Sequence, residues 1–383
     1  MKIAICYSGY LPGEKYGGPV TSIYNFTELL GDDNEIYILC SNHDLKDTTP
    51  YTGIKEGWNT VGKAHVVYLS DQEFNEKRIL NIFDEINPEL VYVSSIFSVK
   101  FNSPAYKAAY KKSIPVLLAP RGELNSKALL NGKLKKKFYI RFFKSMPYFK
   151  NVSFQATSDG EFNDIIHVLK INESRISFLP NIPALPEEKS DIDKQSGKVK
   201  MCFVGRIVPN KNLAVALEAL QHVTSEVSFD IFGAQEDTSY WELCQKLISQ
   251  EPKNVKVNYC GVVNQLKMRN MYKDYDCLIS PTQFENYGQA IVEAMLHDVP
   301  VIISKGTTPW DDISKDGAGY TVEIQDVRGY ASVIDSISCM SREQYELLIM
   351  RLRKYCINRF DFQYLKEKYM NSFSIMSKQT PER

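Results

Sequence analysis

Short apolar runs alternate with helical patterns along the chain. The runs of the first half have the continuous hydrophobic character of strands that are buried on both faces: Lys2–Ser8, Glu35–Ser41, His65–Ser70, Leu90–Ser95, Ile114–Pro120, Val152–Ser158 and the shorter Ile176–Pro180. Strands of a parallel sheet show this pattern because helices cover both sides of the sheet. The first half is therefore predicted to be a parallel α/β domain.

A second series of apolar runs begins after the polar stretch Pro186–Lys198. Its members are Val199–Gly205, Val227–Gly233, Val255–Gly261, Cys277–Ser280, Pro300–Ser304 and Gly319–Glu323. Helical patterns such as Leu213–Val223 and Leu266–Tyr272 lie between them. The two series predict two doubly wound, Rossmann-like domains facing across a cleft, with residues 1–187 in the first and residues 188–359 in the second.

The stretch Cys277–Met295 combines a strand, a loop and a helix that starts near Gly288. Glu285 falls in the loop and Glu293 in the helix. Ligands of parallel α/β domains bind at the carboxyl ends of strands, where loop amides and a loop carboxylate suit sugar hydroxyls. Glu293 is a candidate contact for the hydroxyls of a ribose. The alternative is an ordinary polar loop with Glu293 solvated on the helix surface.

The stretch Phe203–Leu213 opens the second domain and carries a candidate phosphate site. Its strand ends at Gly205, and the next helix starts near Asn212, a residue type that favours the N-cap position. Arg206 and Lys211 lie in the connecting loop. Two cations beside a helix N-terminus are typical of a diphosphate site.

A Gly-rich loop follows the first strand. It contains Gly9–Gly13 and Gly17-Gly18-Pro19 and precedes a helix at Val20–Leu30. Glycines allow backbone amides to approach a ligand closely, although an ordinary strand-to-helix loop has the same appearance. The loop has no G-x-G-x-x-G pattern, which counts against a dinucleotide-dependent dehydrogenase.

Together these motifs resemble the family 4 retaining glycosyltransferases of the GT-B fold, the glycosyl transferases group 1. The resemblance rests on the spacing of Glu285 and Glu293 and on the Gly-Arg-x(4)-Lys-Asn pattern from Gly205. It continues through Val299–Ser304, Thr308-Pro309-Trp310 and Gly317–Tyr320. In the first domain it rests only on Gly17-Gly18 and Pro120-Arg121-Gly122.

The resemblance implies roles for individual residues. Arg206 and Lys211 would hold the donor diphosphate and, with Glu285, serve catalysis. Gly17 and Gly18 would face the diphosphate and the acceptor, and the backbone near Val263 would pair with the nucleobase. The remaining donor-binding positions are Asn286, Tyr287, Gly288, Gln289 and Glu293. The last helix, within residues 360–383, would pack back on the first domain.

Arg121 and the segment after it are the features that the resemblance explains least. Many family members carry a His near Arg121, so the role of that His is not transferred; Arg121 is a candidate contact for a phosphate or an acceptor anion, or a structural salt bridge. The segment that follows, through Lys150, is rich in Lys and Arg, and residues 133–150 include a basic amphipathic helix. Such a helix can contact an anionic membrane or simply pack on the core.

Composition restricts the class of protein. The chain has 383 residues with formal net charge +0, so its overall charge gives no reason to expect nucleic-acid binding. Cys6, Cys40, Cys202 and Cys277 lie inside apolar runs, which predicts buried thiols. The chain shows no signal peptide and no apolar run of the ~18 residues that span a bilayer, so a cytoplasmic protein is expected, either free or at the inner face of the cell membrane.

The predicted reaction is transfer of a hexose or N-acetylhexosamine from a nucleotide diphosphate sugar, with UDP favoured over GDP. The resemblance implies retention and a glycan or polyprenyl-diphosphate-linked acceptor, as in bacterial surface polysaccharide synthesis. Metal independence and the absence of a cofactor are expected, since the triplets Asp191-Ile192-Asp193 and Asp274-Tyr275-Asp276 do not follow strands. No histidine falls in a catalytic motif, so the sequence names no general base. The alternatives are a nucleotide-sugar epimerase and a non-catalytic partner of a larger synthase.

Overall fold

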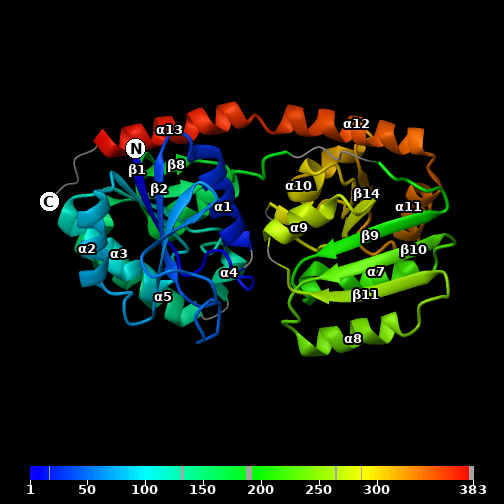
Figure 1. Cartoon of the computed structure of the whole chain (residues 1–383), viewed down its shortest axis with the longest axis horizontal. Helices are drawn as coiled ribbons and strands as arrows, with labels where there is room; N and C mark the ends of the chain where they lie inside the picture. The colour runs from blue at the N-terminus through cyan, green and yellow to red at the C-terminus, as the bar shows by residue number, and fades with distance from the viewer. Residues whose placement is uncertain (17, 131–132, 187–191, 264, 286, 379–383) are drawn as a thin grey trace. The chain divides into compact units, whose positions relative to one another are not determined.

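The computed structural model describes residues 1–16, 18–130, 133–186, 192–263, 265–285 and 287–378. The chain forms two compact units (Figure 1). Unit 1 consists of Met1–Ile182 together with Phe362–Arg383, and unit 2 of Pro183–Asp361. The predicted boundary between residues 187 and 188 lies outside the described residues.

Unit 1 is built on an eight-stranded sheet in the order β3-β4-β2-β1-β5-β6-β7-β8. All neighbouring strands are parallel except β3 and β4. The strands are β1 (Lys2–Cys6), β2 (Glu35–Ser41), β3 (Trp58–Val61), β4 (Ala64–Leu69), β5 (Leu90–Ser94), β6 (Val116–Ala119), β7 (Val152–Ala156) and β8 (Ile176–Phe178). The central strands β1, β5 and β6 are almost entirely buried, which explains their continuous apolar sequence.

The helices of unit 1 connect these strands and cover the sheet. They are α1 (Gly18–Leu30), α2 (Glu76–Ile86), α3 (Val99–Lys112), α4 (Ser126–Leu130), α5 (Lys133–Ser145), α6 (Asp159–Leu169) and α13 (Phe362–Lys378). The helix α2 is capped by Asn75, whose side chain accepts a hydrogen bond from the Arg78 amide, and it ends at Asn87 in a left-handed conformation.

The last helix, α13, is part of unit 1 and lies beside α1 (Figure 1). Its Tyr369 is buried and donates a hydrogen bond to the Pro180 carbonyl at 2.8 Å. Phe373 is also fully buried and packs against Phe26 of α1. The apolar face of α13 therefore completes the core of unit 1.

Unit 2 contains a six-stranded parallel sheet in the order β11-β10-β9-β12-β13-β14. Its strands are β9 (Lys198–Val204), β10 (Glu226–Phe232), β11 (Val255–Gly261), β12 (Cys277–Ser280), β13 (Val301–Ser304) and β14 (Tyr320–Val322). Its helices are α7 (Leu213–Leu220), α8 (Thr238–Ile248), α9 (Gln265–Tyr272), α10 (Gln289–Leu296), α11 (Val327–Cys339) and α12 (Arg342–Arg359). The predicted fold class, two parallel-sheet Rossmann-like domains, is confirmed.

One strand was not predicted. The strand β3 is short, has the polar residues Asn59 and Thr60 between Trp58 and Val61, and none of its residues is buried. It pairs antiparallel with β4 at the edge of the sheet, with Trp58 opposite Val67. Since only one of its sides has a neighbouring strand, its sequence lacks the continuous apolar run by which the other strands were identified.

The four thiols that were predicted to be buried, those of Cys6, Cys40, Cys202 and Cys277, are buried. Cys244 and Cys356 are buried as well, whereas Cys260 and Cys339 are exposed. In the described part of the chain, no helix has both the length and the apolar character needed to cross a bilayer.

Glu251, which follows α8, predicts a pH-dependent stability. Both of its carboxylate oxygens are buried and lack a hydrogen-bond partner among the described residues, and burial raises the pKa of Glu251 to about 7. The pKa of an unfolded Glu is about 4.3, so the folded state loses stability as the pH rises from this value through about 7. Glu251→Gln should therefore stabilise unit 2 at about pH 8 by ~1 kcal/mol, after allowance for solvent screening, and have little effect near pH 4.

Thermal unfolding of both proteins across this pH range measures the effect. Glu242→Gln, on the exposed side of α8, is the matched control and should shift the melting temperature little at either end of the range. An equal gain from Glu251→Gln at both ends would contradict the burial of an ionised carboxylate.

Candidate functional site

The candidate site of unit 2 lies where the strand order reverses. From β9 the chain continues to β10 and β11 on one side of the sheet, whereas β12 leads to β13 and β14 on the other. The loop after β9, which begins at Gly205, and the loop after β12, which begins at Pro281, therefore leave the same edge of the sheet and lead to opposite sides of the strand order. Ligands of open α/β sheets bind at this position.

The loop after β9 is held against the end of β10. The Gly205 amide donates to the Phe232 carbonyl at 2.9 Å, and the Ile207 amide donates to the Ala234 carbonyl at 2.8 Å. Gly233 has φ 150°, and a Cβ there would lie 1.8 Å from the Gly205 carbonyl oxygen. Only glycine fits this contact, which fixes the direction in which the chain enters Arg206.

The predicted N-cap at Asn212 is correct in position but not in chemistry. Asn212 precedes α7, yet its backbone is left-handed, with φ 56°, and its side chain makes no capping hydrogen bond. Its side-chain nitrogen is buried without a partner among the described residues. The residue therefore turns the chain into α7 without satisfying the first helical amides.

Hydrogen bonds join the loop after β9 to the loop after β12. The Asn210 carbonyl accepts from the Gln283 amide at 2.9 Å and from the Thr282 hydroxyl at 3.1 Å, while the Asn210 side chain donates to the Phe284 carbonyl at 3.1 Å. The Glu285 amide donates to the Thr307 carbonyl at 2.8 Å, which adds the loop after β13. Residues from three strand ends are thus held as one framework.

Two cations of the loop after β9 are paired with carboxylates. Lys211 forms an ion pair with Glu285, and their side chains are 21% and 23% exposed. Arg206 pairs with Glu236 at 3.0 Å and is 63% exposed. The structure thus brings Lys211 and Glu285 into direct contact. Glu236, which follows β10, had no signal in the sequence because a lone loop carboxylate has no motif.

Gly288 starts α10 in a left-handed conformation, with φ 76°. A Cβ there would lie 2.9 Å from Ile291 Cδ1 and 3.2 Å from Glu285 Cγ, so the glycine permits Glu285 to lie close to the helix start. Glycine offers no capping side chain, and the first amides of a helix have no intrahelical partners. The predicted neighbour Asn286 lies outside the described residues.

Tyr287 is packed inward. Its carbonyl accepts a hydrogen bond from the Trp310 indole at 2.5 Å, and the two rings meet edge to face. The Tyr287 hydroxyl is buried, and this burial raises its pKa above the ordinary value. Trp310 belongs to the Thr308-Pro309-Trp310 run, so this part of the sequence pattern supplies a side chain that packs against the loop after β12.

Glu293 has no exposed surface, so the alternative of a solvated Glu293 is wrong. Its carboxylate lies 3.6 Å from the Arg269 guanidinium of α9 and accepts a hydrogen bond from Gln289 at 3.3 Å. Arg269 was not among the predicted site residues, and only the fold shows that it contacts Glu293.

Val263 lies just after β11, the strand at this edge of the sheet, and is half-buried.

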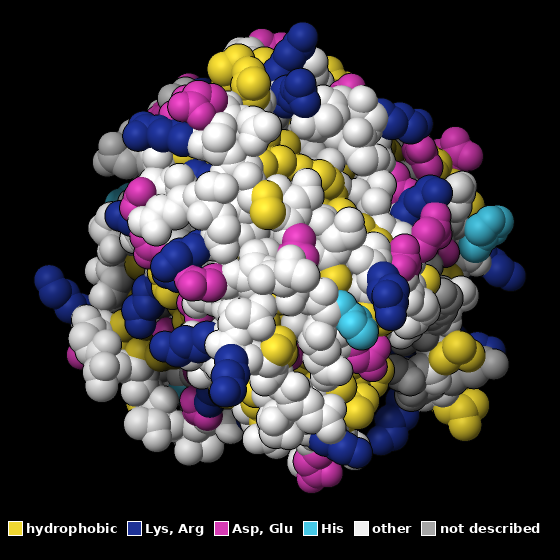
Figure 2. Space-filling view, turned by 90° about the vertical axis from the view of Figure 1, so that its right-hand side faces the viewer, with side chains coloured by type: hydrophobic (Ala, Val, Ile, Leu, Met, Phe, Trp, Pro, Cys, Tyr) yellow, Lys and Arg dark blue, Asp and Glu magenta, His cyan; other side chains and the backbone are white. Residues whose placement is uncertain are grey.

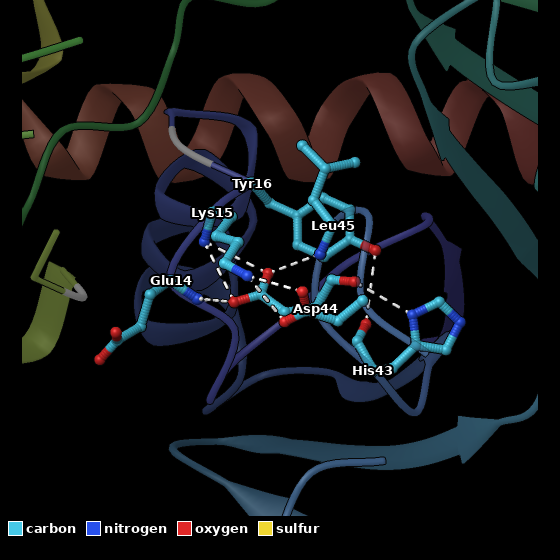
Figure 3. A network of polar contacts seen from close by, with 7 residues as sticks. Glu14, Lys15, Tyr16, His43, Asp44 and Leu45 are labelled. Atoms are coloured by element: carbon cyan, nitrogen blue, oxygen red, sulfur yellow. Dashed lines mark hydrogen bonds and ion pairs between the residues drawn. The ribbon is translucent and has the colours of Figure 1, made fainter. Parts of the chain in front are cut away.

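In unit 1, a buried carboxylate fixes the Gly-rich loop. Asp44 accepts hydrogen bonds from the amides of Glu14 at 2.8 Å, Lys15 at 3.2 Å and Leu45 at 2.8 Å (Figure 3). Gly18 begins α1, and a Cβ added there would meet no atom within 4 Å. Gly17 lies outside the described residues. Asp44 had no signal in the sequence.

Arg121 lies just after β6 in a left-handed conformation, with φ 57°. Its guanidinium donates to the Tyr92 hydroxyl at 2.7 Å and to the Asn181 side chain. Both partners are neutral, and the described residues include no ion pair to Arg121, so the salt-bridge alternative is not what the structure shows. Tyr92 in turn donates to Gln155, which donates to Tyr369 of α13.

Comparison with known proteins agrees with this geometry. Residues 186–354 match the model of the family glycosyl transferases group 1. An uncharacterized 41.2 kDa protein in the cps region of Klebsiella pneumoniae is 24% identical over 336 residues, which are 84% of this chain and 87% of that protein. The O-antigen chain mannosyltransferase RfbU of Salmonella typhimurium is 25% identical over 236 residues, 61% of this chain and 63% of RfbU.

Among solved structures, HepE of Anabaena in complex with UDP and glucose has the same fold, with a TM-score of 0.65 and 14% identity. The match covers 98% of this chain and 100% of HepE. The chain is a glycosyltransferase of the GT-B fold.

In this glycosyltransferase the two cations of the loop after β9 differ in how strongly their carboxylate partners hold them. The Arg206–Glu236 pair is exposed, and exposed ion pairs contribute little to stability. Lys211 lies closer to the protein interior, where charge–charge attraction is stronger. Arg206 can therefore exchange its carboxylate partner at a smaller cost than Lys211 can.

The second Asp-x-Asp triplet of the glycosyltransferase, Asp274-Tyr275-Asp276, lies away from the loop that carries Lys211. Asp276 precedes β12, and its carboxylate accepts a hydrogen bond from the Lys200 amide at 2.7 Å. Asp276 also lines an open groove of about 650 Å³ at the amino ends of β9, β10 and β11, opposite the edge that carries Lys211. Asp191 lies outside the described residues.

Gly233→Ala tests the contact that directs the loop after β9. The new methyl group would clash with the Gly205 carbonyl, so we expect a loss of ~2–3 kcal/mol in unit 2 stability and a loss of transferase activity. Thermal unfolding and a sugar-transfer assay measure both effects. Gly197→Ala is the matched control: it also has positive φ, at 88°, but open space around the Cβ. Equal losses from the two variants would show that the backbone angle, and not the close contact, decides.

Proposed function

We propose that the chain transfers a hexose or N-acetylhexosamine from a nucleotide diphosphate sugar to a glycan or a polyprenyl-diphosphate-linked acceptor, with retention of the anomeric configuration. UDP is the preferred nucleotide, and bacterial surface polysaccharide synthesis is the setting. The observation that carries the proposal is the Lys211–Glu285 pair, with Arg206 on the same loop, at the switch point of a glycosyl transferases group 1 domain.

The cations supply the charge that the reaction requires. In the transfer, the bond between the anomeric carbon and the diphosphate oxygen breaks, and a bond from an acceptor oxygen to the anomeric carbon forms. The leaving diphosphate gains negative charge and can take the acceptor proton. Arg206 and Lys211 then stabilise this charge directly, so the proposed reaction needs neither a metal ion nor a cofactor.

We assign Glu285 and Glu293 to donor binding and not to nucleophilic attack on the sugar. A double displacement needs carboxylates flanking the reacting bond. Glu285 and Glu293 lie on one loop–helix unit, and Glu293 is enclosed by Arg269 and Gln289. We assign Glu285 to a sugar hydroxyl and to orienting Lys211. Glu293 orders the start of α10, and its contact with a ribose remains a prediction.

Related proteins support the choice of donor and setting. HepE binds UDP and glucose, RfbU is an O-antigen mannosyltransferase, and the Klebsiella relative lies in a cps region. The donor-binding roles of Gly17, Gly18, Val263, Asn286, Tyr287, Gly288 and Gln289 are part of the same proposal.

Arg206→Ala and Lys211→Ala should each lower the turnover number by ~10²–10³, because each removes a charge that stabilises the leaving diphosphate. Sugar transfer from UDP-sugars and GDP-sugars, with EDTA present, measures the effect. Lys198→Ala is the control, since Lys198 is an exposed cation paired with Glu226 at the opposite edge of the sheet. Near-normal turnover by both site variants would contradict the diphosphate assignment.

Unfolding with UDP or GDP present separates the competing functions. UDP at about 100 times its dissociation constant should add ~2.7 kcal/mol to the stability of the wild type and less to the two variants. A larger increase in the free energy of unfolding with GDP than with the same concentration of UDP would overturn the UDP preference. Return of an isomerised donor without acceptor would indicate an epimerase. Nucleotide binding without transfer to any acceptor would indicate a non-catalytic partner.

Arg121 is proposed to contact an anion of the acceptor, because it is a half-buried cation held only by neutral partners. A hydrogen bond to a charged group contributes ~1.5–3 kcal/mol, so Arg121→Gln should raise the KM for an anionic acceptor by about 10- to 100-fold and leave UDP binding unchanged. Arg121→Lys retains the charge and should recover part of the loss. A change in UDP affinity without a change in acceptor KM would contradict the assignment.

A further inference from the structure

The helices α4 and α5 of unit 1 present a line of exposed apolar side chains. Large apolar residues recur at every fourth position and are strongly exposed: Leu130 at 63%, Leu134 at 72%, Phe138 at 73% and Phe142 at 55%. Residues four apart lie on one side of a helix, so Leu134, Phe138 and Phe142 form a continuous stripe along α5. Such a stripe is costly in water.

Cations flank the stripe. Lys137, Arg141 and Lys144 lie along one side of it, and Lys135 lies on the other. The sequence contains no Asp or Glu between Glu123 and Asp159, and none of these four cations forms an ion pair with any described residue. Elsewhere the surface differs: on the face shown in Figure 2, Lys and Arg side chains are interspersed with Asp and Glu.

The opposite side of α5 holds the helix in place. Ile140 and Phe143 are buried in the core of unit 1. The Lys136 ammonium donates to the Ala128 carbonyl at 2.6 Å and lies 5.0 Å from the centre of the Phe97 ring. The exposed stripe therefore does not arise from a misplaced core face, because the helix already has a buried face of its own.

The same contacts connect α5 to the loops at the carboxyl edge of the unit 1 sheet. Phe97, which packs against Lys136 and Tyr139, belongs to the loop after β5. The Ile96 amide of that loop donates to Glu123 at 2.7 Å, two residues after Arg121, and burial raises the pKa of the Glu123 carboxyl. The exposed stripe and Arg121 are thus carried by one packed set of loops.

We propose that the α5 surface, defined as Leu134, Phe138 and Phe142 with the flanking Lys135, Lys137, Arg141 and Lys144, docks on an anionic phospholipid bilayer. The helix lies in the plane of the interface, the apolar stripe enters the boundary between headgroups and acyl chains, and the cations contact lipid phosphates. This surface goes beyond the proposed transfer reaction and does not depend on the identity of the donor.

Charge and apolar character together select this partner. A soluble polyanion, such as an acidic glycan, would match the cations but would leave the two Phe side chains in water. A second copy of this surface would bring like charges together without a compensating acid. A bilayer with anionic lipids satisfies both parts, because its phosphates lie at the level of the cations and its acyl chains lie just below.

Vesicle co-sedimentation of the full chain tests the proposal. The probes are vesicles of phosphatidylcholine alone and vesicles in which about a third of the lipid is phosphatidylglycerol. The variant L134S/F138S/F142S removes the stripe and keeps Ile140 and Phe143. The variant L347S/M350S/I357S is the matched control, because it removes three exposed apolar side chains of α12. Circular dichroism and the melting temperature establish that both variants fold.

The wild type and the α12 variant should bind the anionic vesicles, and the α5 variant should bind them at least ~10-fold more weakly. Binding should weaken for vesicles of phosphatidylcholine alone and for anionic vesicles at about 0.5 M salt. Equal binding by the wild type and the α5 variant would overturn the proposal, as would no binding by the wild type. A wild-type dimer in solution that the α5 substitutions convert to a monomer would identify a second copy as the occupant and would also overturn it.

Discussion

The site of unit 2 depends on one constraint, the parallel pairing of β9 with β12 at the centre of the sheet. Met201 pairs with Cys277 and Cys202 with Leu278, so two strands far apart in the sequence end at the same edge. Their loops must then share a small space. The backbone of Asn210 accepts and its side chain donates the hydrogen bonds that join these loops, and the contact between Lys211 and Glu285 follows from that. The positions of the charged side chains in the site thus depend on the pairing of these two strands.

Burial divides the charged groups of the site into two kinds. Glu293 and Arg269 are enclosed, and breaking such a pair would leave an uncompensated buried charge. This pair therefore holds the start of α10. Lys211 and Glu285 are only partly enclosed, and Arg206 lies in solvent. Arg206 can change partners at the smallest cost, because the water around it weakens its ion pair with Glu236. The site thus combines an enclosed ion pair with charged side chains that are partly open to solvent.

Unit 1 follows the same principle with different groups. The Asp44 carboxylate accepts hydrogen bonds from amides of the Gly-rich loop that belong to no helix or strand. These bonds fix a segment whose glycines leave its backbone with few conformational restraints. Arg121 is fixed by neutral groups, namely Tyr92 and Asn181, so its charge remains available to a ligand. The α5 surface adds a cationic and apolar face to the same set of loops.

The sequence by itself determined the parallel α/β class, because strands buried on both faces must be continuously apolar. It also located the Arg206, Lys211 and Glu285 loops, since the ends of such strands are readable in the chain. It did not reveal β3, an edge strand without a continuous apolar run, or the left-handed Asn212, whose side chain does not cap α7. It left open whether Glu293 is solvated. Only the tertiary structure decided that Glu293 meets Arg269, that Glu236 meets Arg206 and that Asp44 holds the Gly-rich loop. These partners are distant in sequence, and a lone charged residue carries no periodicity, so packing alone brings them together.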